Sequence, residues 1–401
     1  MTLLRSVVDN AERHIPYYNN LFTKSGFSPS EIRDFDDFAE IPISTKSMIR
    51  RAYPDQAYAR SSWLDMKVST SGSTGEPFEA ILDGRNHGWR LASRYLFDSW
   101  MGVAPGERWI HIFGHSRLTQ RLRRRLLQGE LQVAADLTSK ERFSEITRLL
   151  VDYKPAGMSG VSSSLALLAK HMGDAGISFT HKLRGVFSCA EMLSDHQKQL
   201  ISSTLSTNVY DRYGLRESAY IAQDCGYHRG LHINSLIVYA EIVKGGRKTA
   251  PGEVGKLIIT DLRNNAMPLI RYDTGDLASI EGECECGRGF PMLANLFGRE
   301  NDYIATKFGL LPALAVTSKF GNEFVQFIHD FQFITSQKGN MLIRLVPTDL
   351  WNQQAEAKVT RFLAGYLEDF NVELVTEIKP EPSGKKPMLK MVGSRARPDP
   401  T

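Results

Sequence analysis

The sequence contains only four cysteines in 401 residues, Cys189, Cys225, Cys284 and Cys286. So low a content excludes a small scaffold held together by disulfides. The chain also lacks internal repeats and low-complexity segments, and it has no run of about 20 apolar residues such as a membrane-spanning helix needs. Its first residues lack the apolar stretch of a signal peptide. We therefore expect a protein of the reducing cytoplasm without a transmembrane segment.

A strong excess of charge of one sign is absent as well. The 49 Lys and Arg residues nearly balance the 45 Asp and Glu residues, which leaves a net charge of +4. This excess is too small for the size of the chain to indicate a nucleic-acid partner by itself. The hydrophobic and charged fractions, 42% and 23%, are those of ordinary globular proteins. The length suits two or three domains.

Strand-like and helix-like patterns alternate through the first half of the chain, which favours parallel α/β units. Ser28 followed by Pro29 and Glu31 is typical of a capped helix start. We predict an α/β protein with a large N-terminal domain of several subdomains over residues 1–301 and a small α+β C-terminal domain over 302–401. The expected elements are helices at 87–100, 165–172, 194–205 and 354–369, and strands at 66–70, 78–82, 109–114, 185–188, 236–243, 255–260, 341–346 and 372–378.

The strongest local motif is rich in hydroxyl groups and glycine. It lies between two expected strands and has the sequence Thr70-Ser71-Gly72-Ser73-Thr74-Gly75-Glu76-Pro77. Glycines allow close backbone approach, and hydroxyl and N–H donors suit anionic oxygens. The spacing and lysine of a Walker loop are missing. A flexible linker is the commoner meaning of such a composition, but the short segment between two strands favours a phosphate loop carried by a hairpin.

Four further motifs follow in order. They are Tyr213-Gly214-Leu215-Arg216-Glu217, Tyr272-Asp273-Thr274-Gly275-Asp276, Gly298-Arg299-Glu300-Asn301-Asp302 and Pro382-Ser383-Gly384-Lys385. With the hydroxyl loop they resemble the ordered motifs of the adenylate-forming enzymes, which include acyl-CoA synthetases, adenylation domains and luciferases. The phrases at 71–77, 230–233 and 266–276 look most like the branch of phenylacetate-CoA ligase and coenzyme F390 synthetase. The resemblance covers about residues 1–390.

The resemblance implies an ATP- and Mg²⁺-dependent enzyme that activates a small-molecule carboxylic acid, by default aryl or arylacetic, and passes the acyl group to coenzyme A. An amine or a carrier-protein thiol is the alternative acceptor, and a silent nucleotide-binding homologue is the alternative to an enzyme. The resemblance also implies a mobile C-terminal domain, and it agrees with a homodimer. The resemblance implies that the β- and γ-phosphates are bound by Thr70, Ser71, Gly72, Ser73, Thr74 and Gly75. It implies adenine stacking by Tyr213 beside Gly214, ribose binding by Asp276 and Arg299, and Mg²⁺ binding by Glu217. Lys385 would stabilise the developing charge, with Lys386 and Lys390 as competitors for this role, and Asp302 would be the hinge.

One position departs from the family pattern. The usual Y-G-x-T-E has threonine where this chain has Arg216. A guanidinium suits a phosphate, so Arg216 either clamps the α-phosphate or fills the site and marks altered or lost adenylation. The acid pocket implied by the resemblance has Phe113, His115, Ala190, Glu191 and Tyr220 as its candidate walls.

Three cysteines lie in two short clusters. Cys284 and Cys286 flank Glu285, and Cys225 precedes His228 and His232. Three sulfurs and one imidazole satisfy a closed tetrahedral zinc site of structural type, although a set of free thiols is the simpler alternative. We prefer His232 as the fourth ligand because it lies in the Gly-Leu-His-Ile phrase of the resembled branch, and His228 is the alternative.

A basic stretch has five arginines between Arg117 and Arg125, and its leucines recur every fourth residue. This pattern predicts an amphipathic helix with a basic face. A solvated surface is its simplest role. A platform for the phosphates of coenzyme A, an anionic membrane surface or an acidic carrier protein are the sharper alternatives.

Overall fold

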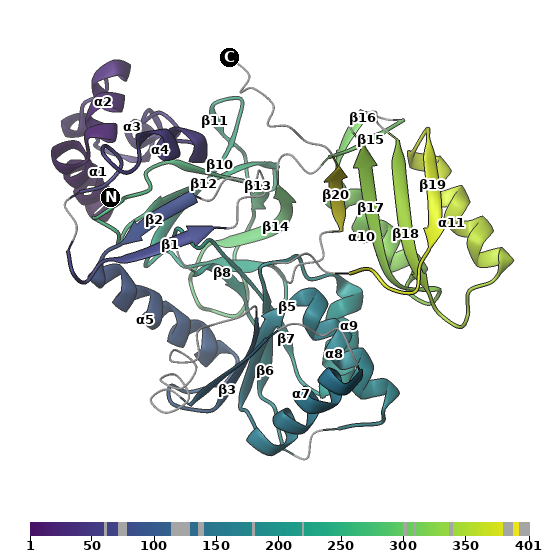
Figure 1. The fold of residues 1–401 in the computed structure, drawn as a ribbon. Coiled ribbons are helices and arrows are strands. Elements are labelled where there is room, and N and C mark those ends of the chain that lie inside the picture. The colour runs from purple at the N-terminus through teal and green to yellow at the C-terminus, as the bar shows by residue number, and fades with distance from the viewer. Residues whose placement is uncertain are drawn as a thin grey trace. The chain divides into compact units, whose positions relative to one another are not determined.

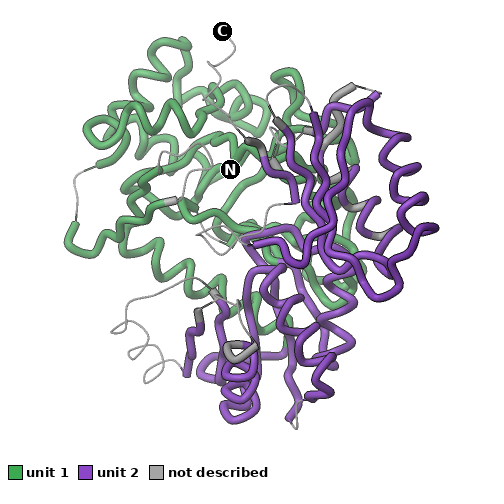
Figure 2. The backbone as a smooth tube through the Cα atoms, turned by 45° about the vertical axis from the view of Figure 1, so that its right-hand side comes forward, with its two compact units in different colours: residues 1–101, 212–299 green, residues 102–211, 300–401 purple. Residues whose placement is uncertain are grey.

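The structure is a computed structural model of the chain. Two compact units make it up, one of Met1–Met101 with Arg212–Arg299 and one of Gly102–Asp211 with Glu300–Thr401 (Figure 2). The domain boundary expected at residue 302 stays a prediction. The structure describes residues 1–59, 62–70, 78–113, 129–134, 140–178, 181–218, 220–299, 303–307, 309–336, 340–379 and 388–392.

The first unit begins with short helices that lie close together (Figure 1), and three of them share one apolar core. Val8, Phe22 and Phe38 are almost fully buried in it, together with Leu262 and Ile270 from much later in the chain. Burial of such side chains contributes roughly 1.5–3 kcal/mol each, so the core ties the N-terminal helices to the rest of the unit. The helices that share this core are α1 (Thr2–His14), α2 (Pro16–Ser25) and α3 (Phe35–Ala39), whereas α4 (Lys46–Ala52) packs its Ile49 into the core of the strands.

The helix start expected at Ser28 is only a single 3-10 turn, η1 (Pro29–Glu31). Ile32 ends the turn because its backbone is extended, at φ −67° and ψ 107°. The Ser28 hydroxyl pairs with that of Ser30 at 2.8 Å and caps no backbone N–H. A good capping signal therefore did not lead to a helix here, because the backbone turns away after three residues.

The predicted hairpin around the hydroxyl loop is confirmed. Strands β1 (Met66–Thr70) and β2 (Phe78–Leu82) are antiparallel, and Thr70 lies opposite Phe78 at the last pair before the loop. Helix α5 (Gly84–Trp100) follows, and its N-cap Asp83 accepts a hydrogen bond of 2.7 Å from the Asn86 N–H.

Antiparallel strands make up most of the rest of the first unit. Their order is β11-β10-β12-β13-β14-β9-β8-β7, where the end of β7 belongs to this unit. Ile221, Leu257 and Tyr272 are among the side chains buried in its core. The strands are β7 (Val209–Gly214), β8 (Tyr220–Asp224), β9 (Leu231–Ile233), β10 (Val238–Lys244), β11 (Arg247–Lys248), β12 (Gly255–Asp261), β13 (Tyr272–Ile280) and β14 (Met292–Arg299).

The first part of the second unit is a parallel α/β layer, which confirms the predicted class. Its strands run in the order β4-β3-β5-β6 and continue to the start of β7. Ile110, Met158 and Val186 form its core with apolar side chains of the helices. Its elements are β3 (Trp109–Phe113), β4 (Glu130–Ala134), α7 (Lys140–Tyr153), β5 (Gly157–Val161), α8 (Ser162–Asp174), β6 (Gly185–Cys189) and α9 (Asp195–Leu205).

The C-terminal part of the second unit has a separate core, in which Phe320, Phe324 and Phe333 are buried. Its four-stranded sheet has the order β19-β18-β17-β20. The elements are β15 (Tyr303–Thr306), β16 (Gly309–Pro312), α10 (Ala313–Phe324), β17 (Ile328–Ser336), β18 (Met341–Pro347), α11 (Gln353–Tyr366), β19 (Phe370–Leu374) and β20 (Leu389–Val392). Throughout the described part of the chain, no helix combines the length and the apolar composition needed to cross a membrane.

Candidate active site and candidate metal centre

Tyr213 and Asp276, the residues expected at adenine and ribose, meet in the first unit. Tyr213 lies near the end of β7 and Asp276 in β13, and the Tyr213 hydroxyl donates a hydrogen bond of 2.6 Å to Oδ2 of Asp276. Burial, followed by the nearby carboxylate, raises the pKa of the Tyr213 phenol well above its usual value of 10.0. Tyr213 therefore remains a hydrogen-bond donor at neutral pH, and it orients Asp276.

The backbone around Asp276 is shaped by the preceding Thr-Gly pair. The Thr274 hydroxyl donates to the Leu257 carbonyl at 2.8 Å and accepts from the Asp276 N–H at 3.1 Å. Gly275 has φ +76°, a conformation that glycine adopts without strain. These contacts explain why the motif contains threonine and glycine directly before its carboxylate. Arg299, expected on the ribose side, is paired with Asp276 in the register of β13 and β14.

Glu217, the candidate Mg²⁺ ligand, follows β7 in a turn and is 4% exposed. Its Oε1 accepts a hydrogen bond of 3.0 Å from the Tyr272 hydroxyl and lies 3.4 Å from the ammonium of Lys46. A carboxylate held in this way is a suitable oxygen ligand for Mg²⁺. Tyr272 and Lys46 were not selected as site residues from the sequence. Tyr272 was already within a motif, whereas Lys46 carried no local signal.

Arg216 points to the strand that leads into the hydroxyl loop. Its Nη1 donates a hydrogen bond of 2.8 Å to the carbonyl of Ser69, the residue before Thr70. The guanidinium of Arg90 on α5 donates to the carbonyls of Arg216 and Ser218, so the turn that carries Glu217 is held from a second side. Arg216 therefore links the turn of Glu217 to the stem of the loop.

The candidate wall residues of the acid pocket include Phe113, Ala190 and Glu191 in the second unit and Tyr220 in the first. In the second unit, Ala190 follows β6 with φ +70°, and strained backbone of this kind is concentrated at functional sites. The next residue, Glu191, accepts a hydrogen bond of 3.2 Å from the Ser163 N–H in the first turn of α8. Phe113 ends β3. In the first unit, the ring of Tyr220 lies 5.2 Å from the guanidinium of buried Arg212.

Several candidates lie outside the described residues. They are the loop residues Ser71, Gly72, Ser73, Thr74 and Gly75, the pocket residue His115, the hinge Asp302, the catalytic Lys385 and the basic stretch at 117–127. Their roles stay predictions.

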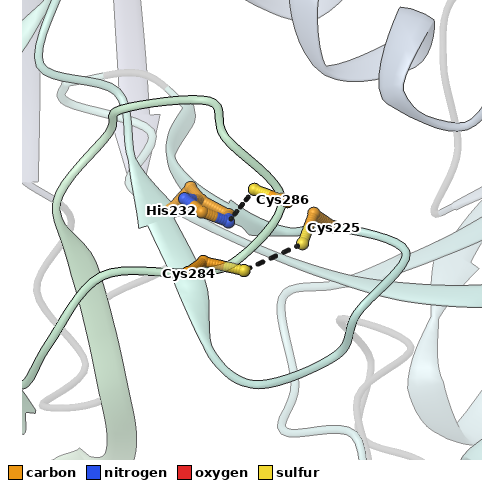
Figure 3. A group of neighbouring side chains, drawn as sticks. All are labelled: Cys225, His232, Cys284 and Cys286. Atoms are coloured by element: carbon orange, nitrogen blue, oxygen red, sulfur yellow. Dashed lines mark hydrogen bonds between the residues drawn. The ribbon is translucent and has the colours of Figure 1, made fainter.

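The structure brings Cys225, His232, Cys284 and Cys286 together in the first unit (Figure 3). One ligand atom from each lies within 4.8 Å of all the others. Cys225 follows β8 and His232 lies in β9, while the other two are in the loop between β13 and β14. The pairing of Met292 with His232, which joins β14 to β9, brings the two parts of the cluster together.

The donor set fits zinc. The sulfurs of Cys225 and Cys284 are 3.7 Å apart, and that of Cys286 is 3.3 Å from Nε2 of His232. Tetrahedral zinc with its usual bond lengths separates such ligand atoms by about 3.4–3.8 Å. Nδ1 of His232 lies 3.3 Å from the Phe290 carbonyl, the kind of contact that fixes the ring of a ligating histidine.

His228, the alternative fourth ligand, is not part of this group. Its Nδ1 lies 2.8 Å from Oδ2 of Asp224. The sequence spacing alone could not separate the two histidines, because the strand pairing that places His232 is a long-range contact.

Comparisons with known proteins agree with the motifs. The phenylacetate-coenzyme A ligase of Thermus thermophilus is 26% identical over 316 residues, which cover 75% of this chain and 69% of that protein. Protein CapK of Staphylococcus aureus is 21% identical over 390 residues, 94% of this chain and 84% of that protein. No protein-family model matches.

Among solved structures, 2-hydroxyisobutyryl-CoA ligase in its postadenylation state, in complex with R3-HIB-AMP, superposes with a TM-score of 0.82 at 19% identity. The match covers 98% of this chain and 88% of that one, so the two share their fold. The ordered motifs, the sequence relatives and the shared fold lead to one conclusion. The chain belongs to the adenylate-forming superfamily, in its phenylacetate-CoA ligase-like branch.

Proposed function

We propose that this protein activates a carboxylic acid with ATP as an acyl-adenylate and transfers the acyl group to coenzyme A. In the first step a carboxylate oxygen bonds to the α-phosphorus and pyrophosphate leaves. In the second step the thiol sulfur bonds to the acyl carbon, AMP leaves, and the thiol gives up its proton. The observation that carries the proposal is the hydrogen bond of 2.6 Å between Tyr213 and Asp276, 63 residues apart in sequence, at the positions expected for adenine and ribose.

Positioning and charge neutralisation suffice for such a reaction. Asp276, oriented by Tyr213, would accept hydrogen bonds from the ribose hydroxyls, because an ionised carboxylate only accepts. Glu217 would hold Mg²⁺, which neutralises phosphate charge when bound. Lys385 would supply positive charge near the α-phosphate from a C-terminal domain that begins at the Asp302 hinge.

The acid and the acceptor are proposed from the relatives. Proteins named phenylacetate-coenzyme A ligase support an aryl or arylacetic acid and coenzyme A. Transfer to an amine or to a carrier-protein thiol is the alternative. The alternative of a silent homologue rests on Arg216, whose contact with the Ser69 carbonyl gives it a structural role that does not require catalysis.

A structural zinc ion on Cys225, His232, Cys284 and Cys286 is part of the proposal, supported by the distances between the ligand atoms. A set of four protein ligands leaves no open position, so the ion would stabilise the fold. We also propose a cytoplasmic location, supported by the four cysteines, none of which forms a disulfide. A homodimer stays a prediction.

Exchange of labelled pyrophosphate into ATP, measured with a panel of aryl, arylacetic and short aliphatic acids, tests the proposal. We expect exchange with at least one acid, and formation of its thioester when coenzyme A is added. Exchange without a thioester would refute the ligase version and favour another acceptor. ATP binding without exchange for any acid would refute the proposal that the protein is an acid-activating enzyme.

A further inference from the structure

Lys46 is a cation that no sequence motif identified. It is the first residue of α4, whose N-cap Thr45 accepts a hydrogen bond of 3.3 Å from the Met48 N–H. Its ammonium lies 3.4 Å from Oε1 of Glu217 and 5.1 Å from the ring centre of Phe78, the first residue after the hydroxyl loop. Lys46 therefore lies between the candidate Mg²⁺ ligand and the end of the candidate phosphate loop.

The backbone near Lys46 is attached to the strand that carries the ribose motif. Ser44 donates its N–H to the Arg271 carbonyl at 2.9 Å, and its carbonyl accepts from the Asp273 N–H at 2.9 Å. These bonds form a parallel bridge between Ser44 and Tyr272. The same strand, β13, supplies the Tyr272 hydroxyl to Glu217. Lys46 therefore lies only two residues after Ser44, whose backbone is hydrogen-bonded to the start of β13.

Burial differs between the two charged partners. The side chain of Glu217 is 4% exposed and that of Lys46 is 36% exposed. A nearly buried carboxylate needs a compensating partner, since an isolated buried charge is strongly unfavourable. The ammonium supplies this compensation, and the Lys46 side chain is exposed enough for a ligand to reach it from solvent.

A cation also lies at the other end of the loop. Thr70 and Phe78 form the last strand pair before it, and the Arg216 guanidinium donates to the carbonyl of Ser69 on the incoming strand. Lys46 lies against Phe78 on the outgoing strand. Both ends of the hydroxyl loop therefore carry a positive side chain, an arrangement that suits a ligand with several negative charges.

We propose that Lys46 belongs to the site that holds the β- and γ-phosphates of ATP, where it also keeps Glu217 in place. This inference rests on the proposed function for the identity of the nucleotide. It assigns Lys46 to the phosphates alone, because adenine and ribose fall to Tyr213 and Asp276. Loss of the ammonium should therefore weaken the binding of ATP and leave that of AMP unchanged.

Calorimetric titration of the full chain with ATP and with AMP, both in Mg²⁺, tests this assignment. For Lys46→Met we expect the Kd of ATP to rise by about tenfold or more and that of AMP to stay within about twofold. Lys46→Arg, which keeps the charge, should restore most of the ATP affinity. The matched control is Lys244→Met, which removes a lysine paired with Glu253 at 2.9 Å on an exposed hairpin and should bind both nucleotides normally.

Unchanged ATP affinity in Lys46→Met would overturn the inference, and so would an equal loss for ATP and AMP, which indicates a general structural defect. The two proposals can fail separately. ATP binding that depends on Lys46, without pyrophosphate exchange for any acid, would keep the phosphate site and remove the acid activation. Absence of ATP binding by the unmodified protein would overturn both.

Discussion

At the scale of single residues, Arg216 joins the turn of Glu217 to the strand that enters the hydroxyl loop, through its hydrogen bond to the Ser69 carbonyl. Threonine, the usual residue of the family at this position, is uncharged and too short to make this bond. The replacement therefore adds a cation where the phosphates are expected, which agrees better with an altered phosphate site than with an inactive one.

Arg216→Thr, which introduces the residue usual in the family, should lower the rate of pyrophosphate exchange by about tenfold, because the charge and the bond to β1 are both lost. The measurement is the exchange rate at saturating acid, with Arg216→Lys as the variant that keeps the charge. A higher rate in Arg216→Thr than in the unmodified protein would show instead that Arg216 obstructs adenylation.

Asp261, at the end of β12, is a buried carboxyl group whose pKa burial raises from 3.8 to about 6. A raised pKa means that the folded protein binds the proton more tightly than the unfolded chain does. The stability that this group contributes is therefore present below about pH 4 and is lost as the pH rises through 6.

The matching prediction concerns Asp261→Asn, which cannot ionise. Between pH 4 and pH 7 the free energy of unfolding of the unmodified protein should fall relative to that of the variant, by up to about 3 kcal/mol. Denaturant titrations of both proteins at several pH values measure the difference. A difference that does not change with pH would show that Asp261 has an ordinary pKa in the folded protein.

At the scale of elements, local sequence patterns were sufficient to predict several helices, strands and one hairpin. Alternating strand and helix patterns identified β3, β6, α8 and α9 to within a few residues, and the Gly/Ser segment between two strands identified the hairpin of β1 and β2. Positions that depend on long-range pairing could not be predicted in this way.

Two residues illustrate the limit. Lys46 reaches Glu217 only because Ser44 bridges to Tyr272, 228 residues further along the chain. His232 joins the cysteines through the pairing of β9 with β14, and a local spacing rule favours His228 equally well. In both cases the sequence shows the chemical type of the side chain but not the distant residue that it contacts.

The cysteine cluster predicts about one zinc ion per purified chain. Removal of the ion should lower Tm by at least about 5 °C, because the ligands link the loop between β13 and β14 to β8 and β9. Elemental analysis and thermal unfolding before and after chelation check both values. The ring of Trp100 lies 5.6 Å from that of His232, so its fluorescence should also respond.

Cys284→Ser should lose the zinc, whereas Cys189→Ser is the control and should retain it, because Cys189 lies in β6 of the second unit. If protein purified without added chelator holds almost no zinc, the cluster is a set of ordinary thiols and not a metal site.

At the scale of the whole molecule, we expect the two half-reactions to depend on different residues. Lys385→Ala should lower pyrophosphate exchange by about a hundredfold or more, because the charge near the α-phosphate is lost. Thioester formation from a synthetic acyl-adenylate needs no such charge and should stay within about threefold. Lys390→Ala, on β20, is the comparison variant. Loss of both half-reactions in Lys385→Ala, or loss of exchange in Lys390→Ala alone, would contradict the assignment.

The proposed function depends above all on activation of the acid as an adenylate. It is tested most directly by supplying a turned-over acid with ¹⁸O in its carboxyl group, together with ATP, Mg²⁺ and coenzyme A, and by analysing the products by mass spectrometry. We expect AMP to acquire one ¹⁸O per turnover, since the carboxylate oxygen bonds to the α-phosphorus and stays there when the thiol displaces AMP. Label in inorganic phosphate, with ADP formed in place of AMP, would contradict it.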